Sequence, residues 1–235
     1  MRSYLIALLL VLPIFLYSGQ TSIYDIQYTN NSGTDGTYPS AYRNQIVTTS
    51  GIVTATGYRN GGFFISEPEG GPWRGIYIND RSREVRLGDL VELTGEVTEQ
   101  FGFTTIRNVR QLKVISSNNS LPAPALVTTG ELAVSEAYEG VLVQLANVSV
   151  SGYGNQNEVW LINDGSGLSR LGTGFINNVN TGLNISTGHS YSRVIGVVDY
   201  RFGEYRINPR NGNDLLSSPV GVNRPSWGRI KSYYR

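Results

Sequence analysis

Aromatic side chains interleaved with arginines are the feature of this 235-residue sequence that most directly suggests chemistry. Aromatic rings stack on nucleobases and guanidinium groups bind phosphates, so this combination is typical of single-stranded nucleic-acid binding. The candidate ligand-binding residues are Tyr58, Arg59, Phe64, Trp73, Arg74, Tyr77, Phe101, Phe103 and Arg107 in the first half, and Tyr153, Trp160, Phe202 and Arg206 in the second. Tyr200 and Arg201 lie next to the second group.

The residues needed for catalysis do not cluster in the sequence. Acidic residues are scattered singly, and the lone histidine, His189, follows a glycine where we expect a turn. No nucleophile elbow, phosphate-binding loop or zinc-protease motif is present. We therefore expect no catalytic residue, no metal site and no cofactor. An OB-fold nuclease with Arg and Glu around a calcium ion stays open as an alternative.

The N-terminal segment, residues 1–19, reads as a secretory signal peptide. Arg2 precedes a continuous apolar run that ends in small residues, and retention as a membrane anchor is the alternative. We expect a secreted or cell-envelope protein that is not integral to the membrane after cleavage. Without Arg2 the 19 Lys and Arg fall to 18, which equals the 18 Asp and Glu. Such a neutral chain predicts weak, salt-dependent binding to a polyanion.

Alternating Thr- and Val-rich runs separated by turn residues predict an all-β protein without amphipathic helices. The chain has no cysteine, so its stability must come from its cores. The expected strands of the first half are Gln45–Tyr58, Gly62–Glu67, Arg74–Asn79, Asp89–Gln100 and Phe103–Ile115, and the Pro-containing segment Ser116–Leu126 is a linker.

After the linker the pattern repeats, which predicts two similar units over 41–115 and 127–216. Five strands per unit, the first bent at a central glycine, Gly51, fit a Greek-key barrel of the OB-fold better than a seven-stranded immunoglobulin-like sandwich. The prediction is two tandem OB-fold-like five-stranded barrels. A basic tail, 217–235, follows, with four cations and no acid from Gly221 onward.

The first repeat resembles the OB-fold domain that precedes the catalytic domain of secreted bacterial nucleases. Four blocks carry the resemblance in order: "SGIVTAT", "GGFFISEPEG", "GIYIN" and "LGDLVELTGEVTEQFGFTTI". The chain has no catalytic domain of that type after its second repeat, so the resemblance implies a binding module, duplicated here in a bacterial protein. The partners it implies are single-stranded DNA or RNA, with a separate secreted nuclease or a cell-surface component as further candidates. A module for glycans or proteins is the alternative function.

Two adjacent phenylalanines, Phe63 and Phe64, must point to opposite faces of their strand. The repeat aligns Val159 with Phe63 and Trp160 with Phe64. We therefore expect Phe63 in the core and Phe64 on the exposed binding face.

Overall fold

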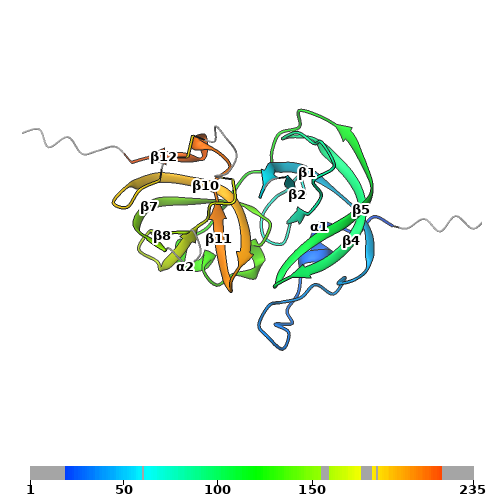
Figure 1. The fold of residues 1–235 in the computed structure, drawn as a ribbon, viewed down its shortest axis with the longest axis horizontal. Coiled ribbons are helices and arrows are strands. Elements are labelled where there is room, and N and C mark those ends of the chain that lie inside the picture. The colour runs from blue at the N-terminus through cyan, green and yellow to red at the C-terminus, as the bar shows by residue number, and fades with distance from the viewer. Residues whose placement is uncertain (1–18, 60, 155–158, 176–181, 184, 219–235) are drawn as a thin grey trace, which may run out of the picture.

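The computed structural model describes residues 19–59, 61–154, 159–175, 182–183 and 185–218. Two β-barrels lie side by side, with the N-terminal barrel on the right and the second on the left in Figure 1. The fold is all-β with two OB-fold-like five-stranded barrels, as expected. The predicted signal peptide (1–19) falls outside the described residues except for Gly19, and so does the predicted tail (217–235) except for its first two residues.

The first barrel is closed in the strand order β1-β2-β3-β5-β4. Its strands are β1 (Ile46–Tyr58), β2 (Gly62–Ser66), β3 (Gly75–Ile78), β4 (Leu90–Gln100) and β5 (Phe103–Ser116). Every expected strand of this half is confirmed to within one residue at each end. Alternation of buried and exposed residues along β4 explains this agreement, because a half-buried strand has a period of two residues.

The first strand serves both sides of the barrel, as its central glycine predicted. β1 pairs with β4 from Ile46 to Ile52 and with β2 from Ile52 to Tyr58. A Cβ at Gly51 would lie 2.9 Å from the backbone oxygen of Ser66, so only glycine fits at this bend.

The second barrel closes through the pairing of β10 with β7. Its strands are β7 (Leu142–Gly154), β8 (Val159–Asn163), β9 (Leu168–Leu171), β10 (Ser190–Arg201) and β11 (Glu204–Asn208), and β6 (Ala125–Leu126) and β12 (Leu215–Ser217) extend the same sheet. The exposed His189 directly precedes β10. The short helical segments are α2 (Thr129–Leu132), η1 (Glu136–Tyr138) and η2 (Gly212–Asp214).

A five-residue helix, α1 (Ile23–Gln27), precedes the first barrel and was not expected. Ile23 and Ile26 are fully buried in the first barrel's core, so this core extends beyond the range 41–115. The helix is too short to show a helical period in the sequence. Within the described residues, no helix has the length and apolar character required to cross a membrane.

Strand pairing places the two repeats in a register that differs by one residue from the sequence alignment. Ile65 pairs with Val53 in the first barrel, and Ile162 pairs with Val150 at the same position of the second. Trp160 is therefore equivalent to Phe63, and Leu161 to Phe64. The expected match of Trp160 with Phe64 is therefore wrong by one residue. This difference matters because a slip of one residue moves a side chain to the opposite face of a strand.

Candidate nucleic-acid interface

An aromatic cluster joins the two barrels. Phe64, Tyr77, Phe103 and Tyr58 project from the outside of the first barrel and pack against Leu142, Phe175 and Val197 of the second. The rings meet at centroid distances of 5.0 Å for Phe64 and Tyr77 and 5.4 Å for Tyr58 and Phe175. The outer face of β1–β3, which a solitary barrel would expose, is therefore the interface between the barrels.

This interface corrects the expectation for Phe64. Phe63 lies in the barrel core and Phe64 points outward, as expected, but Phe64 is 0% exposed because the second barrel covers it. Tyr58, Tyr77 and Phe103 are also almost fully buried. The expectation that they are exposed stacking platforms is therefore wrong, because most of each ring surface is covered. The second barrel supplies the apolar surface that these rings need.

The equivalent face of the second barrel is polar. By strand register Leu161, Arg170 and Glu204 stand where the first barrel has Phe64, Tyr77 and Phe103. Arg170 Nε donates to Glu204 Oε1 at 3.1 Å, and all three residues are partly exposed. The two repeats therefore differ at this face, which is buried in the first barrel and solvated in the second.

Glycines let the two backbones approach each other. A Cβ at Gly75 would lie 2.3 Å from the backbone oxygen of Gly140, and a Cβ at Gly140 would lie 2.5 Å from that of Gly75. Hydrogen bonds flank this contact: Thr104 N donates to Glu139 Oε1 at 2.8 Å, and Arg59 N donates to the oxygen of Gly174 at 3.0 Å. The two barrels therefore form one packed unit.

A group of three hydrogen-bonded polar side chains, Tyr58, Asp199 and Asn208, is buried under the aromatic cluster. Tyr58 Oη donates to Asp199, which also accepts a hydrogen bond from Asn208 Nδ2 at 2.8 Å. Asp199 is fully buried, and burial raises the pKa of its carboxyl against the opposing effect of these two donors. Burial, and next the Asp199 charge, raises the pKa of Tyr58 well above its usual value. Arg59 Nε donates to Tyr58 Oη at 3.1 Å, which connects the group to the surface.

A cleft of about 560 Å³ opens above this group, between the barrels. Its lining residues are Tyr58, Arg59, Tyr77, Asn79, Arg81, Gln100, Phe101, Phe103, Tyr200, Arg201, Phe202 and Gly203. These described lining residues include three arginines and six aromatic residues but no Asp or Glu. The cleft is large enough for a ligand of drug or nucleotide size, and it concentrates positive charge in a chain whose formal net charge is only +1.

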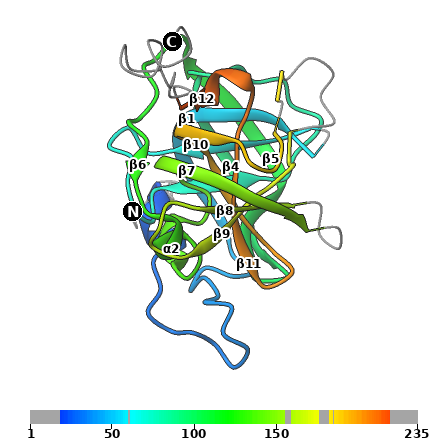
Figure 2. The ribbon, with the colours of Figure 1, turned by 90° about the vertical axis from the view of Figure 1, so that its left-hand side faces the viewer.

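Two hairpin tips form the rim of the cleft. The β4–β5 hairpin ends in Phe101 and Gly102, and the β10–β11 hairpin ends in Phe202 and Gly203. Both tips lie at the same end of the molecule in the two views of Figure 1 and Figure 2. Phe101 is 96% exposed and Phe202 is 64% exposed. Among the aromatic candidates that line the cleft, these two are the exposed ones.

The cleft thus brings together six of the thirteen candidate residues: Tyr58, Arg59, Tyr77, Phe101, Phe103 and Phe202. Arg206 is 1% exposed and lies beneath the cleft, with its guanidinium carbon 5.3 Å from the Phe202 ring centroid. Burial lowers the pKa of this guanidinium. Its expected direct contact with a ligand is wrong, because the side chain is enclosed between the barrels.

The other candidates lie away from the cleft. Trp73 packs edge-on against Tyr28 at 5.5 Å, and Arg74 pairs with Glu67. Arg107 is exposed on the outer part of β5, 3.4 Å from Glu96. On the second barrel Tyr153 and Trp160 contact each other at 4.7 Å, with Trp160 partly buried against the core. Spacing in the sequence does not reveal that these residues are separated from the cleft.

Six lining residues were not among the thirteen candidates: Asn79, Arg81 and Gln100 in the first barrel, and Tyr200, Arg201 and Gly203 in the second. Each lies at or close to a strand end, next to a candidate aromatic in space. The signal for Arg81 was available, since it directly follows "GIYIND", where a loop must leave the barrel mouth.

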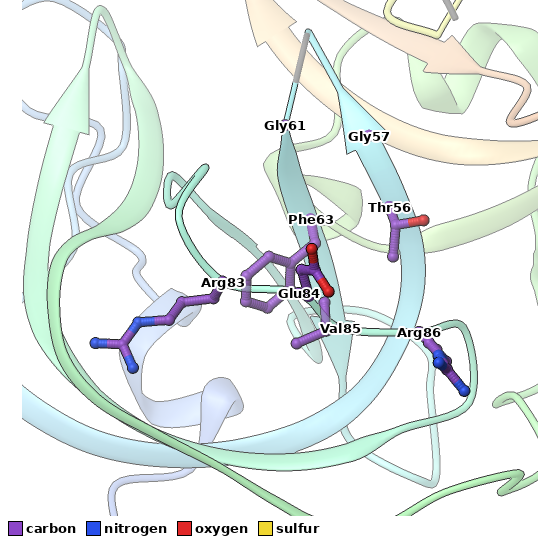
Figure 3. A pocket seen from close by; sticks show the side chains of 8 residues that line it. All are labelled: Thr56, Gly57, Gly61, Phe63, Arg83, Glu84, Val85 and Arg86. Carbon is purple, nitrogen blue, oxygen red and sulfur yellow. The ribbon is translucent and has the colours of Figure 1, made fainter.

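A second hollow of about 320 Å³ lies on the first barrel, and it differs from the cleft. Figure 3 shows Glu84 beside Phe63, with the side chains of Arg83 and Arg86 directed away from each other. Charged groups that do not converge cannot hold a ligand by several contacts at once. Within the described residues, no group of three or more His, Cys, Asp or Glu could hold a metal ion.

The fold and cleft define a two-barrel all-β protein with a basic, aromatic groove between its units. The chain is 30% identical over 190 residues to Endonuclease YhcR of Bacillus subtilis (strain 168). The match covers 73% of this chain but only 15% of that protein, so the chain spans a small part of its relative. No family model matches the chain. A solved murine DNA-binding protein bound with ds DNA aligns over 73% of this chain and 97% of its own, at 11% identity and a TM-score of 0.36, which is too low to support an argument.

Proposed function

We propose that the protein is an exported, non-catalytic nucleic-acid-binding protein whose ligand lies in the cleft between the barrels. One observation carries the proposal: the described lining of the cleft combines three arginines and two exposed phenylalanines and includes no carboxylate. Arginine attracts and orients phosphate, and aromatic rings stack on bases. The similarity to a protein named as an endonuclease supports nucleic acid as the ligand class.

The charges of the cleft set the strength and the salt dependence of binding. Arg59 lies near the buried Asp199, so its positive charge is partly compensated, whereas Arg81 is exposed. Three arginines that contact a single strand correspond to a slope of log K against log salt of roughly −2. Affinity should then fall roughly 15- to 20-fold between 50 and 200 mM salt.

Fluorescence anisotropy with a labelled 12-nucleotide single strand, titrated across that salt range, tests the proposal. Arg81→Ala should weaken binding and make the slope shallower by about 0.7. Arg110→Ala is the matched control, because Arg110 is also exposed but does not line the cleft. Absence of binding at the lowest salt contradicts the proposal, and a salt-insensitive affinity for a glycan would favour a glycan-binding module instead.

The absence of catalysis is part of the proposal. Its support is the scattering of acidic residues in the sequence and the lack, in the described part of the chain, of a metal-binding cluster. A plasmid-nicking assay with calcium and with magnesium tests it. Turnover by the purified protein that persists through a second purification step would contradict it.

Export rests on the sequence of residues 1–19. If the segment is a signal peptide, the protein recovered from outside the cytoplasm should begin close to Gln20. N-terminal sequencing of that fraction tests this, and an intact Met1 would favour a retained anchor.

A further inference from the structure

The hairpin tips at the cleft are equivalent elements of the two repeats. Gln100 pairs with Phe103 across the first tip, and Arg201 pairs with Glu204 across the second, so each loop has two residues with the sequence Phe-Gly. The first tip also touches the second unit: a Cβ on Gly102 would lie 2.8 Å from the Tyr200 ring. The same loop from each copy therefore faces one shared space.

Both phenylalanines adopt a backbone conformation that is unfavourable for their residue type. Phe101 has φ of 57° and Phe202 has φ of 55°, and the glycines that follow have φ of 85° and 78°. Two consecutive positive φ values define the type I′ turn, in which asparagine followed by glycine is preferred. A phenylalanine at the first position is strained, and at 96% exposure Phe101 gains almost no packing in return.

The ligand-facing surfaces of the rings differ. No described aromatic ring lies against Phe101, whereas the guanidinium carbons of Arg201 and Arg206 lie 5.0 and 5.3 Å from the Phe202 ring centroid, and Phe202 is still 64% exposed. The first barrel's own outer face cannot serve in their place, because the second barrel covers it. A base that enters the cleft can therefore reach an open ring from one barrel and a cation-backed ring from the other.

We propose that Phe101 and Phe202 hold one unpaired nucleobase between them. Neither barrel then forms the site alone, and the site excludes duplex ends and paired bases. This inference rests on the proposed function and specifies its ligand class as single strands and extrahelical bases. A base offers two faces for stacking only after it has left its pair and its neighbours. The arginines of the cleft then bind the phosphates on either side of it.

An abasic oligodeoxynucleotide with one central 2-aminopurine isolates this contact, because it offers a single base and an unchanged backbone. The wild-type protein should quench the 2-aminopurine fluorescence and bind this strand about tenfold more tightly than a fully abasic strand. Phe101→Asn should remove about this tenfold advantage, with an unchanged or higher midpoint of unfolding, because asparagine suits the turn better. Tyr28→Ala, an exposed aromatic away from the cleft, should change nothing.

The double variant Phe101→Asn/Phe202→Asn decides whether the two rings hold the same base. If they do, its loss should be smaller than the product of the two single losses. Losses that multiply would overturn the inference, since each ring would then act on its own. Equal binding of the abasic and 2-aminopurine strands would overturn it while leaving the proposed function intact, whereas no binding of either strand at low salt would mean that the proposed function itself fails.

Discussion

Replacing Phe64 with alanine removes the ring at the centre of the contact between the barrels. Phe64 is fully buried and lies 5.1 Å from Tyr58, 5.0 Å from Tyr77 and 6.4 Å from Phe103, measured between ring centroids. Truncating a buried phenylalanine costs about 3 to 5 kcal/mol, from lost apolar burial and the cavity that remains. For a domain of this size the melting temperature should fall by roughly 10 °C.

The assay must show that the loss reaches both barrels. A background with Trp73 and Trp227 replaced by phenylalanine leaves Trp160, on the second barrel, as the only tryptophan. Urea unfolding followed by Trp160 fluorescence and by far-UV circular dichroism should give coincident transitions, both moved to lower urea by Phe64→Ala. Leu161→Ala is the matched control, because Leu161 holds the equivalent position on the solvated face and should cost about 1 kcal/mol or less.

An unchanged Trp160 transition in Phe64→Ala would refute the reasoning, since the second barrel would then not depend on the contact. So would a cost for Phe64→Ala as small as that for Leu161→Ala. The structure also reverses the simplest expectation from the sequence, because Phe64→Ala should now affect stability at least as strongly as Phe63→Ala.

Two further predictions concern the same interface. Burial raises the pKa of Glu136 from its usual 4.5 to about 7, and Tyr205, Glu99 and Glu139 lie around its carboxyl. The native state therefore keeps a proton on Glu136 that the unfolded chain releases. As the pH rises from 4.5 to 7, the free energy of unfolding should fall by up to about 3 kcal/mol. Urea midpoints at pH 5 and pH 8 measure this fall, and Glu136→Gln should reduce it; equal midpoints in the wild type would contradict it. Gly75→Ala places a methyl group against the backbone of Gly140 and should cost about 1 to 3 kcal/mol, measured by thermal unfolding, whereas Gly154→Ala, with only ordinary contacts, should be close to neutral.

The local structure could be predicted because it depends on short-range patterns. Alternating side chains fixed the strands of the first barrel, and Gly51 marked the bend of β1. The two residues between the expected strands Asp89–Gln100 and Phe103–Ile115 indicated a tight hairpin. The repeat indicated two units of one design, although its alignment slipped by one residue at Trp160. In the first barrel a bulge lies between Thr56 and Tyr58, and the described pairing of β7 with β8 shows no bulge after Gly152.

The candidate site could be predicted only in part, because a linear pattern does not specify what covers a surface. The sequence determined by itself that Phe63 and Phe64 point to opposite faces, since successive side chains in a strand must do so. Only the tertiary structure decided that the outward face of the first barrel is buried, because that depends on the apolar surface of Leu142, Phe175 and Val197, which belong to the other repeat. The same packing left Phe101 and Phe202 exposed and placed both tips at one cleft.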